Sequence, residues 1–158
     1  MLNEFQKRAL SIASNLWKVM QDRLNTPRGQ IIAEETYWYT HVPTNVPAAG
    51  TATVQIPIQA DADFDAYYLS ATGIQAGAIA ASPYMLFQIT DTGTGKTLFS
   101  TDLLVVLGAG TSGLPYILQN VRTFKMKSNI QITYTNPSAT DTIMQTSFGG
   151  IKTFFAKD

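Results

Sequence analysis

The sequence lacks residues on which several classes of protein depend. It has no cysteine and a single histidine, His41, in 158 residues. Without cysteine there can be no disulfide, thiolate metal site or cysteine nucleophile. No Gly-x-Ser-x-Gly nucleophile elbow accompanies His41, and no second histidine can pair with it on a metal, so we expect a strand-end or interface residue there. The sequence therefore predicts a protein that is not an enzyme and needs no cofactor.

Charge is also scarce. Charged residues make up 14% of the chain, against about 25% in ordinary globular domains, and eleven bases balance eleven acids. Nucleic-acid binders need an excess of Lys and Arg to neutralise phosphates, so the balance argues against that class. No run of 18 apolar residues occurs, and Glu4, Lys7 and Arg8 stand where a signal peptide would be apolar. We expect no nucleic-acid partner, no membrane partner and no cleaved secretion signal.

Glutamate is absent after residue 35, and the chain changes character there. Before that point, apolar residues recur in steps of three and four, at Leu2, Phe5, Ala9, Ile12, Leu16 and Val19. This spacing predicts a helix over residues 3–24, which ends before Pro27. The helix could pack on its own β body or on another subunit. We favour another subunit because Leu10, Trp17 and Met20 widen the apolar sector, and Phe5, Ile12, Leu16 and Trp17 are the predicted contact residues.

An aromatic segment follows the predicted helix. Residues 36–42, with the sequence Thr-Tyr-Trp-Tyr-Thr-His-Val, read as a first strand or as an extended arm. We therefore divide the chain into an N-terminal helix and arm, residues 1–42, and a β-sandwich domain, residues 43–158. In a strand, Trp38 faces away from Tyr37 and Tyr39, so one aromatic side needs a partner outside a two-layer core. Tyr37 and Trp38 are therefore also predicted to contact another subunit.

The remainder of the chain is rich in short alternating segments separated by Gly, Pro and Asn. The clearest is 130–136, in which Ile130, Ile132 and Tyr134 are predicted to face inward. Pro57 indicates an edge strand or a bulge. Such a pattern predicts a mainly β protein, an antiparallel β-sandwich or jelly roll with one N-terminal α-helix. The predicted strands are 51–59, 64–72, 84–91, 96–107, 121–126, 130–136, 142–148 and 151–155.

Two loops resemble ligand sites. Residues 90–97 end like a nucleotide-binding loop, but Thr90 replaces the required first glycine and no helix follows, so a hairpin turn is predicted. Asp61, Asp63 and Asp65 have the spacing that opens a calcium loop. The glycine and glutamate that an EF-hand needs further along are missing. A solvated loop is the favoured interpretation there, and a looser calcium site stays open.

The order of motifs in residues 84–155 resembles β-sandwich structural proteins of tailed bacteriophage particles. The motifs are an Asp-Gly hairpin, a Leu-Pro after a Gly-rich loop, an Arg-aromatic strand, an Asn-initiated strand and a closing Phe-Gly segment: 91–95, 113–115, 122–124, 129–136 and 148–154. Gly150 is an insertion relative to this pattern. The resemblance implies a virion protein, a minor capsid, decoration or collar protein, assembled in the host cytoplasm. Its partners would be capsid, portal or tail proteins, and it would form a homo-oligomer.

Two other classes remain as alternatives. A carbohydrate-binding module in host recognition would use exposed tyrosines, with calcium at Asp61–Asp65 as an option. A bacterial adhesin or pilin-like subunit would share the β-sandwich, but we expect no export signal here. Specific glycan binding that a chelator abolishes would distinguish the module from the virion protein.

Overall fold

The computed structural model describes Ser14 and residues 31–75, 77–80, 84–111 and 114–155. Apart from Ser14, the helix predicted over 3–24 lies outside these residues, and so do Phe5, Ile12, Leu16 and Trp17. Among the described residues, no helix is long and apolar enough to cross a membrane.

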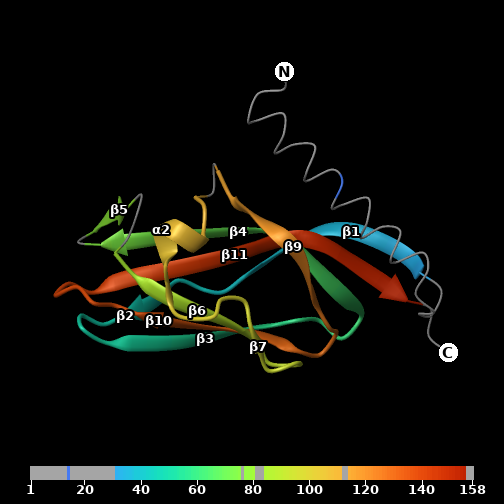
Figure 1. Ribbon diagram of the computed structural model, residues 1–158, viewed down its shortest axis with the longest axis horizontal. Coiled ribbons are helices and arrows are strands. Elements are labelled where there is room, and N and C mark those ends of the chain that lie inside the picture. The colour runs from blue at the N-terminus through green and yellow to red at the C-terminus, as the bar shows by residue number, and fades with distance from the viewer. Residues whose placement is uncertain (1–13, 15–30, 76, 81–83, 112–113, 156–158) are drawn as a thin grey trace, which may run out of the picture.

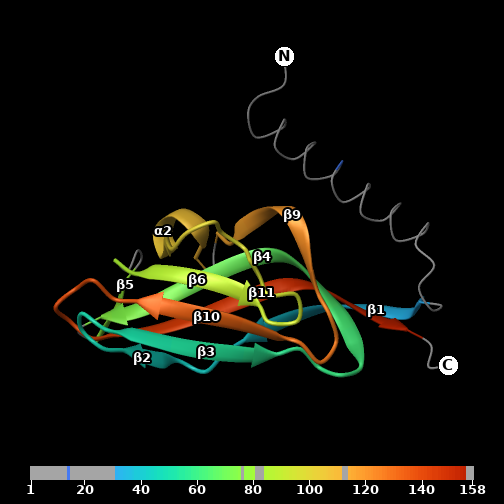
Figure 2. The same cartoon turned by 60° about the horizontal axis from the view of Figure 1, so that its bottom comes forward.

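Two antiparallel sheets stack as two layers (Figures 1 and 2). The six-stranded sheet has the order β1-β11-β4-β5, with β2 on β11 and β9 on β4. Its strands are β1 (Ile31–Thr40), β2 (Thr44–Val46), β4 (Ala62–Gln75), β5 (Ala78–Ala80), β9 (Tyr116–Phe124) and β11 (Thr142–Phe155). The five-stranded sheet has the order β3-β10-β6-β7, with β8 on β6. Its strands are β3 (Thr51–Pro57), β6 (Leu86–Asp91), β7 (Lys96–Thr97), β8 (Leu103–Leu104) and β10 (Asn129–Thr135), and a short helix, α2 (Val105–Gly108), follows β8.

The core lies between the two layers. The inward positions of β10, at Ile130, Ile132 and Tyr134, are fully buried, as their alternation predicts. They meet large side chains from both sheets, among them Phe64, Phe87, Phe124 and Phe148. The prediction of a mainly β, two-sheet protein is therefore confirmed.

Several strand boundaries differ from the sequence prediction. Residues 96–107 were predicted as one strand, which is wrong: they form β7, β8 and the first three residues of α2, with bends between β7 and β8. The strands predicted at 142–148 and 151–155 are a single strand, β11, because a register shift at Gly149/Gly150 absorbs the two glycines. β2 was missed because Pro43 and Pro47 flank its three residues.

Two predictions of local geometry are confirmed. Asp91 pairs with Lys96 across the predicted hairpin, and Gly95 has a φ of +69°, whereas Gly93 is not in the left-handed region. The Asp91 carboxylate accepts hydrogen bonds from the Gly93 N–H and from the Thr94 hydroxyl. Pro57 is the last residue of β3, which lies at an edge of its sheet, where a missing donor is tolerated.

The aromatic segment is a strand of the larger sheet. β1 pairs with β11 almost residue by residue, from Ile31 opposite Phe155 to Thr40 opposite Ser147. Of the two interpretations, first strand and extended arm, the structure has the strand. The division placed after residue 42 therefore does not coincide with the start of the sheet.

Candidate functional site

Trp38 projects from the outer face of the six-stranded sheet. It is 49% exposed, whereas Tyr39 beside it is 5% exposed and packs in the core against Phe64. The predicted opposition of neighbouring rings in this strand is therefore confirmed. Within the described residues, this half-exposed tryptophan is the largest apolar side chain that the fold leaves in solvent at this face.

Gly149 lets the indole lie down on the sheet. Gly149 is opposite Trp38 in the β1–β11 register, and a Cβ on it would come 2.7 Å from indole atoms Cη2 and Cζ2. The ring therefore covers the space that a side chain at 149 would fill. Tyr68 is opposite Gly149 on the other side, and its ring is 6.3 Å from the indole with 15° between the planes. We call this nearly parallel arrangement of Trp38 and Tyr68 around Gly149 the aromatic platform.

The apolar surface continues across the sheet. Ile117 of β9 is opposite Tyr68, and both residues are 40% exposed. A second exposed apolar row, of Ile143, Ile74 and Ile79, crosses β11, β4 and β5 further along. Between the rows the register places hydroxyl side chains, Thr40, Ser147 and Ser70. Apolar rows separated by uncharged polar side chains are typical of surfaces that other molecules cover.

A buried lysine of β11 lies beside β1, on the face of the sheet opposite to Trp38. Lys152 of β11 is 2% exposed, and its Nζ lies 4.3 Å from the centre of the Tyr37 ring and 5.5 Å from that of Phe154. It donates a hydrogen bond to the Gln59 Oε1 and lies 3.7 Å from Glu35 and 3.8 Å from Asp61. Rings and carboxylates together replace the water that the ammonium loses. Tyr37, predicted to contact another subunit, is therefore half-buried in a contact within its own chain.

His41 is buried at the end of β1 and is fixed by hydrogen bonds. The Thr146 N–H donates to its Nε2 at 3.0 Å, so Nε2 is an acceptor and Nδ1 carries the proton, which it donates to the Val42 carbonyl at 2.6 Å. The Tyr134 hydroxyl lies 2.8 Å from Nε2 and 2.6 Å from the Thr146 hydroxyl. Burial lowers the pKa of His41, and the bond to Val42 opposes this only in part. The residue is therefore a neutral structural histidine at a strand end.

The three aspartates of the calcium-like motif have separate partners. Asp63 accepts hydrogen bonds from Lys125, at 2.6 Å, and from the Met126 N–H, at 3.0 Å. The Thr123 hydroxyl donates to Asp65, and Asp61 lies near Lys152. In the part of the chain that the structure describes, no three acidic or histidine side chains come together as a metal site would require. The solvated loop predicted for these residues is wrong, because Asp63 and Asp65 are buried in β4, and the three aspartates make separate contacts and not a single centre.

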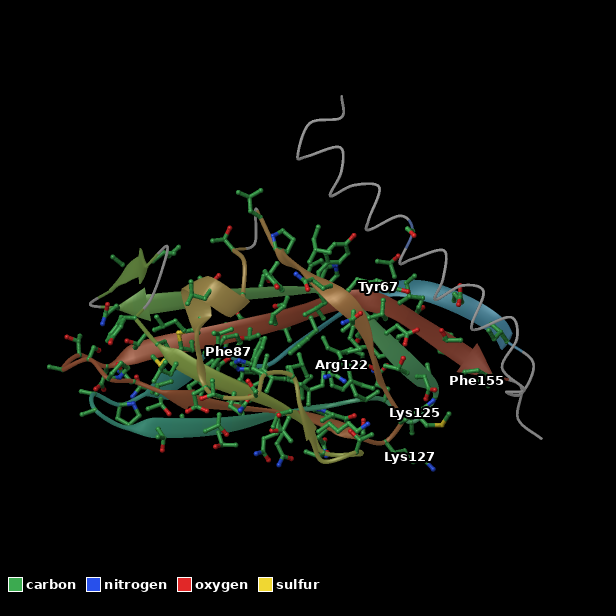
Figure 3. All side chains as sticks on the ribbon, in the orientation of Figure 1. Tyr67, Phe87, Arg122, Lys125, Lys127 and Phe155 are labelled. Atoms are coloured by element: carbon green, nitrogen blue, oxygen red, sulfur yellow. The ribbon has the colours of Figure 1, made fainter. Side chains whose placement is uncertain are left out.

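A shallow groove of about 300 Å³ lies beneath β9. It forms because β9 leaves its partner: Ala66 pairs with Arg122 and Tyr68 with Ile117, so four residues of β9, 118–121, stand opposite one residue of β4. The groove is lined by Leu98, Phe99, Tyr116 and residues 118–122. Arg122 donates to the Thr97 carbonyl and lies between the layers, while Lys125 and Lys127 lie at the turn into β10 (Figure 3). Its one cationic group is thus already engaged.

Sequence reasoning found one member of the platform and missed the others. Trp38 was identified because successive side chains in a strand point to opposite faces, so Trp38 had to point away from Tyr37 and Tyr39. Tyr68, Gly149 and Ile117 come from three other strands, and no local pattern connects them with Trp38. The Phe-Gly-Gly sequence at 148–150 was the available signal, because a glycine in a strand often marks close approach by another group.

Comparison with known proteins adds little to this geometry. No family model matches the sequence, and no curated protein matches it either. Among solved structures, the chain is similar to dimeric latent PorU from Porphyromonas gingivalis, with 9% identity and a TM-score of 0.35. The match covers 81% of this chain and 14% of the PorU chain. The chain therefore spans about one seventh of that protein, and a likeness this weak carries no functional argument.

Proposed function

We propose that this chain is a non-enzymatic structural protein that binds neighbouring subunits through the aromatic platform and its N-terminal segment. The observation that carries the proposal is the platform itself: Trp38 and Tyr68 lie nearly parallel and about half exposed on a rigid sheet. Side chains already fixed on paired strands lose little conformational freedom on binding, so the entropic cost of covering them is small.

The platform offers a useful but modest binding energy. Aromatic side chains bury about 150–250 Å² each when fully covered, so the exposed parts of Trp38 and Tyr68 amount to roughly 200 Å². At about 25 cal/mol per Å², covering them contributes about 5 kcal/mol, before the cost of association. A single platform contact is therefore weak, and stable binding needs the N-terminal segment or repetition of the contact in a symmetric assembly.

The setting we propose is the particle of a tailed bacteriophage. The resemblance in residues 84–155 supports it, together with the low charge and the absence of cysteine from the sequence. In this proposal the sandwich is of jelly-roll type and carries one N-terminal helix. The protein is a minor capsid, decoration or collar protein, and it binds capsid, portal or tail proteins as a homo-oligomer.

Incorporation into particles tests the proposal. Tagged chains carrying Trp38→Ala and Tyr68→Ala together should lose at least tenfold in copies per purified particle, measured by quantitative mass spectrometry. Tyr84→Ala is the matched control, because Tyr84 is 62% exposed and is not one of the residues of the platform. Full incorporation of the double variant would contradict the proposal, provided that both variants unfold at the wild-type temperature.

Carbohydrate binding is a second candidate that one observation favours. Nearly parallel exposed rings stack on pyranose rings, and the hydroxyl side chains of Thr40 and Ser147 lie beside them. A glycan array with the full chain, followed by titration of the hit against Trp38→Ala, decides this candidate. Binding that Trp38→Ala abolishes would favour the module, and an array without hits would count against it.

A further inference from the structure

We infer that the free edge of β1 pairs with the β1 edge of a second copy of the chain, so that two six-stranded sheets join into one. The inference rests on the proposed function for its homo-oligomer and names one contact between the copies. β1 stands first in the strand order of its sheet and pairs with β11 along one side. Within the described residues, no strand pairs with its other side. The backbone N–H and C=O groups of that side are the groups that an added strand binds.

The β1 edge lacks the features that usually prevent pairing. Natural edge strands are commonly protected by lysine, proline, a bulge or short length. β1 has ten residues and no Lys, Arg or Pro, and its one register shift, between Ile31 and Ala33, lies at its start. The Trp38 indole leans over Gly149 of β11, away from the free side. The strand is therefore an open and unbroken edge from Ala33 to Thr40.

The other edges of the two sheets are shorter or interrupted. On the far side of the larger sheet, β5 has three residues and β9 bulges at 118–121. In the smaller sheet, β7 has two residues and β3 ends at Pro57. Among the described strands, the partner that matches the length of the β1 edge is therefore β1 of another copy. Two such edges meet about a twofold axis, and neither is then left free.

The glutamates of β1 decide the register of this pair. Strands related by a twofold axis are antiparallel, and like charges directly opposite each other are unfavourable. An axis at Glu35 would place that residue opposite its own copy, and an axis at Thr36 would make the two Glu35 side chains diagonal neighbours, roughly 7–8 Å apart. An axis at Tyr37 separates them by roughly 14 Å and keeps an overlap over residues 34–40. Because an axis further along would shorten the overlap, the pairing is centred on Tyr37.

The pairing supplies hydrogen bonds and doubles the platform. An overlap over residues 34–40 of both strands forms about six to eight backbone hydrogen bonds, within the range of about 5–15 that specific interfaces have. Trp38, Gly149 and Tyr68 of the two copies then lie side by side on the outer face of the joined sheet. A dimer therefore presents two platforms to one neighbouring protein, which is the repetition that a weak single contact needs.

Electron paramagnetic resonance on the full-length chain tests the inference, because the sequence has no cysteine and a single one can be introduced and labelled. Thr36 is exposed, and in the proposed register its Cα lies roughly 8 Å from that of Thr36 in the second copy. Nitroxides on Thr36→Cys should therefore broaden each other's spectra. Refolding with a tenfold excess of unlabelled chain should abolish the broadening.

Thr97→Cys is the matched control for the labelling. Thr97 is an exposed threonine on β7, which the smaller sheet places three strands away from β3. β3 is the strand that lies beside β2, and β2 follows β1 along the same side of β11. Labels at Thr97 in the two copies are therefore far apart in the proposed dimer and should show no broadening.

A charge placed on the edge gives a second test. Thr36→Lys introduces the residue that natural edges use against pairing, and it makes two like charges diagonal neighbours across the axis. We expect the dissociation constant of the dimer, measured by sedimentation equilibrium, to rise at least tenfold. Thr97→Lys should leave this constant unchanged, and circular dichroism establishes that both variants are folded.

Each other outcome overturns the inference. A monomeric wild-type chain would show that the β1 edge is covered within its own chain or stays unpaired. A dimer without broadening at Thr36, or one that Thr36→Lys does not weaken, would place the contact on another surface. The two proposals can fail separately: a monomeric chain can need the platform for incorporation into particles, and the β1 pair can form in solution while platform variants are incorporated normally.

Discussion

The stability of this protein should fall as pH drops from 7.5 to 5.5, and His41 should be the cause. It is the only histidine in the chain, so few other groups titrate in that window. In the fold its Nε2 accepts the Thr146 N–H, and protonating this nitrogen would put two donors face to face. Burial lowers the pKa of His41 below its usual value of 6.5. The unfolded chain therefore takes up a proton at a pH where the folded chain does not.

The sign and size of the effect follow from proton linkage. Stability is fully present above pH 6.5 and is lost as the pH falls from 6.5 toward the pKa of the folded state, because the unfolded state binds more protons there. The loss at pH 5.5 is at most RT ln(1 + 10), about 1.4 kcal/mol, which is reached when the folded state takes up no proton there. For a chain of this length that corresponds to about 3–6 °C in melting temperature.

The assay is urea unfolding at pH 7.5, 6.5 and 5.5 at constant ionic strength, with the pKa of His41 measured directly by NMR on the folded protein. His41→Gln is the control, because an amide can accept the Thr146 N–H and does not titrate. The variant should be less stable at pH 7.5 and should show less than a third of the wild-type pH dependence. An equal pH dependence in both proteins, or an NMR pKa of 6.5 or above, would refute the reasoning.

Two further predictions concern β11. Gly150→Ala should cost more than about 3 kcal/mol in the free energy of unfolding, because the new Cβ would come 2.0 Å from the Asp65 carbonyl oxygen, a backbone atom of the next strand. Gly149→Ala should cost less than about half as much, since it displaces only the half-exposed Trp38 ring; equal losses in urea unfolding would contradict this. Lys152→Met should change stability by less than about 1.5 kcal/mol, because Glu35 and Asp61 are half exposed and can be solvated without the lysine. Lys152→Ala should lower the free energy of unfolding by about 2–4 kcal/mol, because it leaves a cavity between the rings. A Met variant as unstable as the Ala variant would show that the charge of Lys152, and not its volume, stabilises the fold here.

Features that depend on neighbours along the chain could be predicted before the fold was known. The alternation of apolar and polar residues predicted that Ile130, Ile132 and Tyr134 lie in the core. It also predicted that Trp38 points away from Tyr37 and Tyr39, because successive side chains of a strand point to opposite faces. Turn chemistry fixed the hairpin after Asp91, since Gly95 adopts the left-handed conformation that other residues avoid. The helix predicted over 3–24 belongs to the same kind of inference, and it stays a prediction.

Contacts between residues far apart in the sequence could not be predicted in this way. Strand pairing brought Gly149 between Trp38, 111 positions earlier in the sequence, and Tyr68, 81 positions earlier, and these three residues form the platform. Strand pairing also buried Lys152 against the Tyr37 ring and brought His41 within hydrogen-bonding distance of Tyr134 and Thr146. Lysine and histidine usually lie at the surface, so their burial could not be predicted from the sequence. The physical reason is that strand direction and alternation are local properties of the backbone, whereas register is set by the packing of the whole sheet.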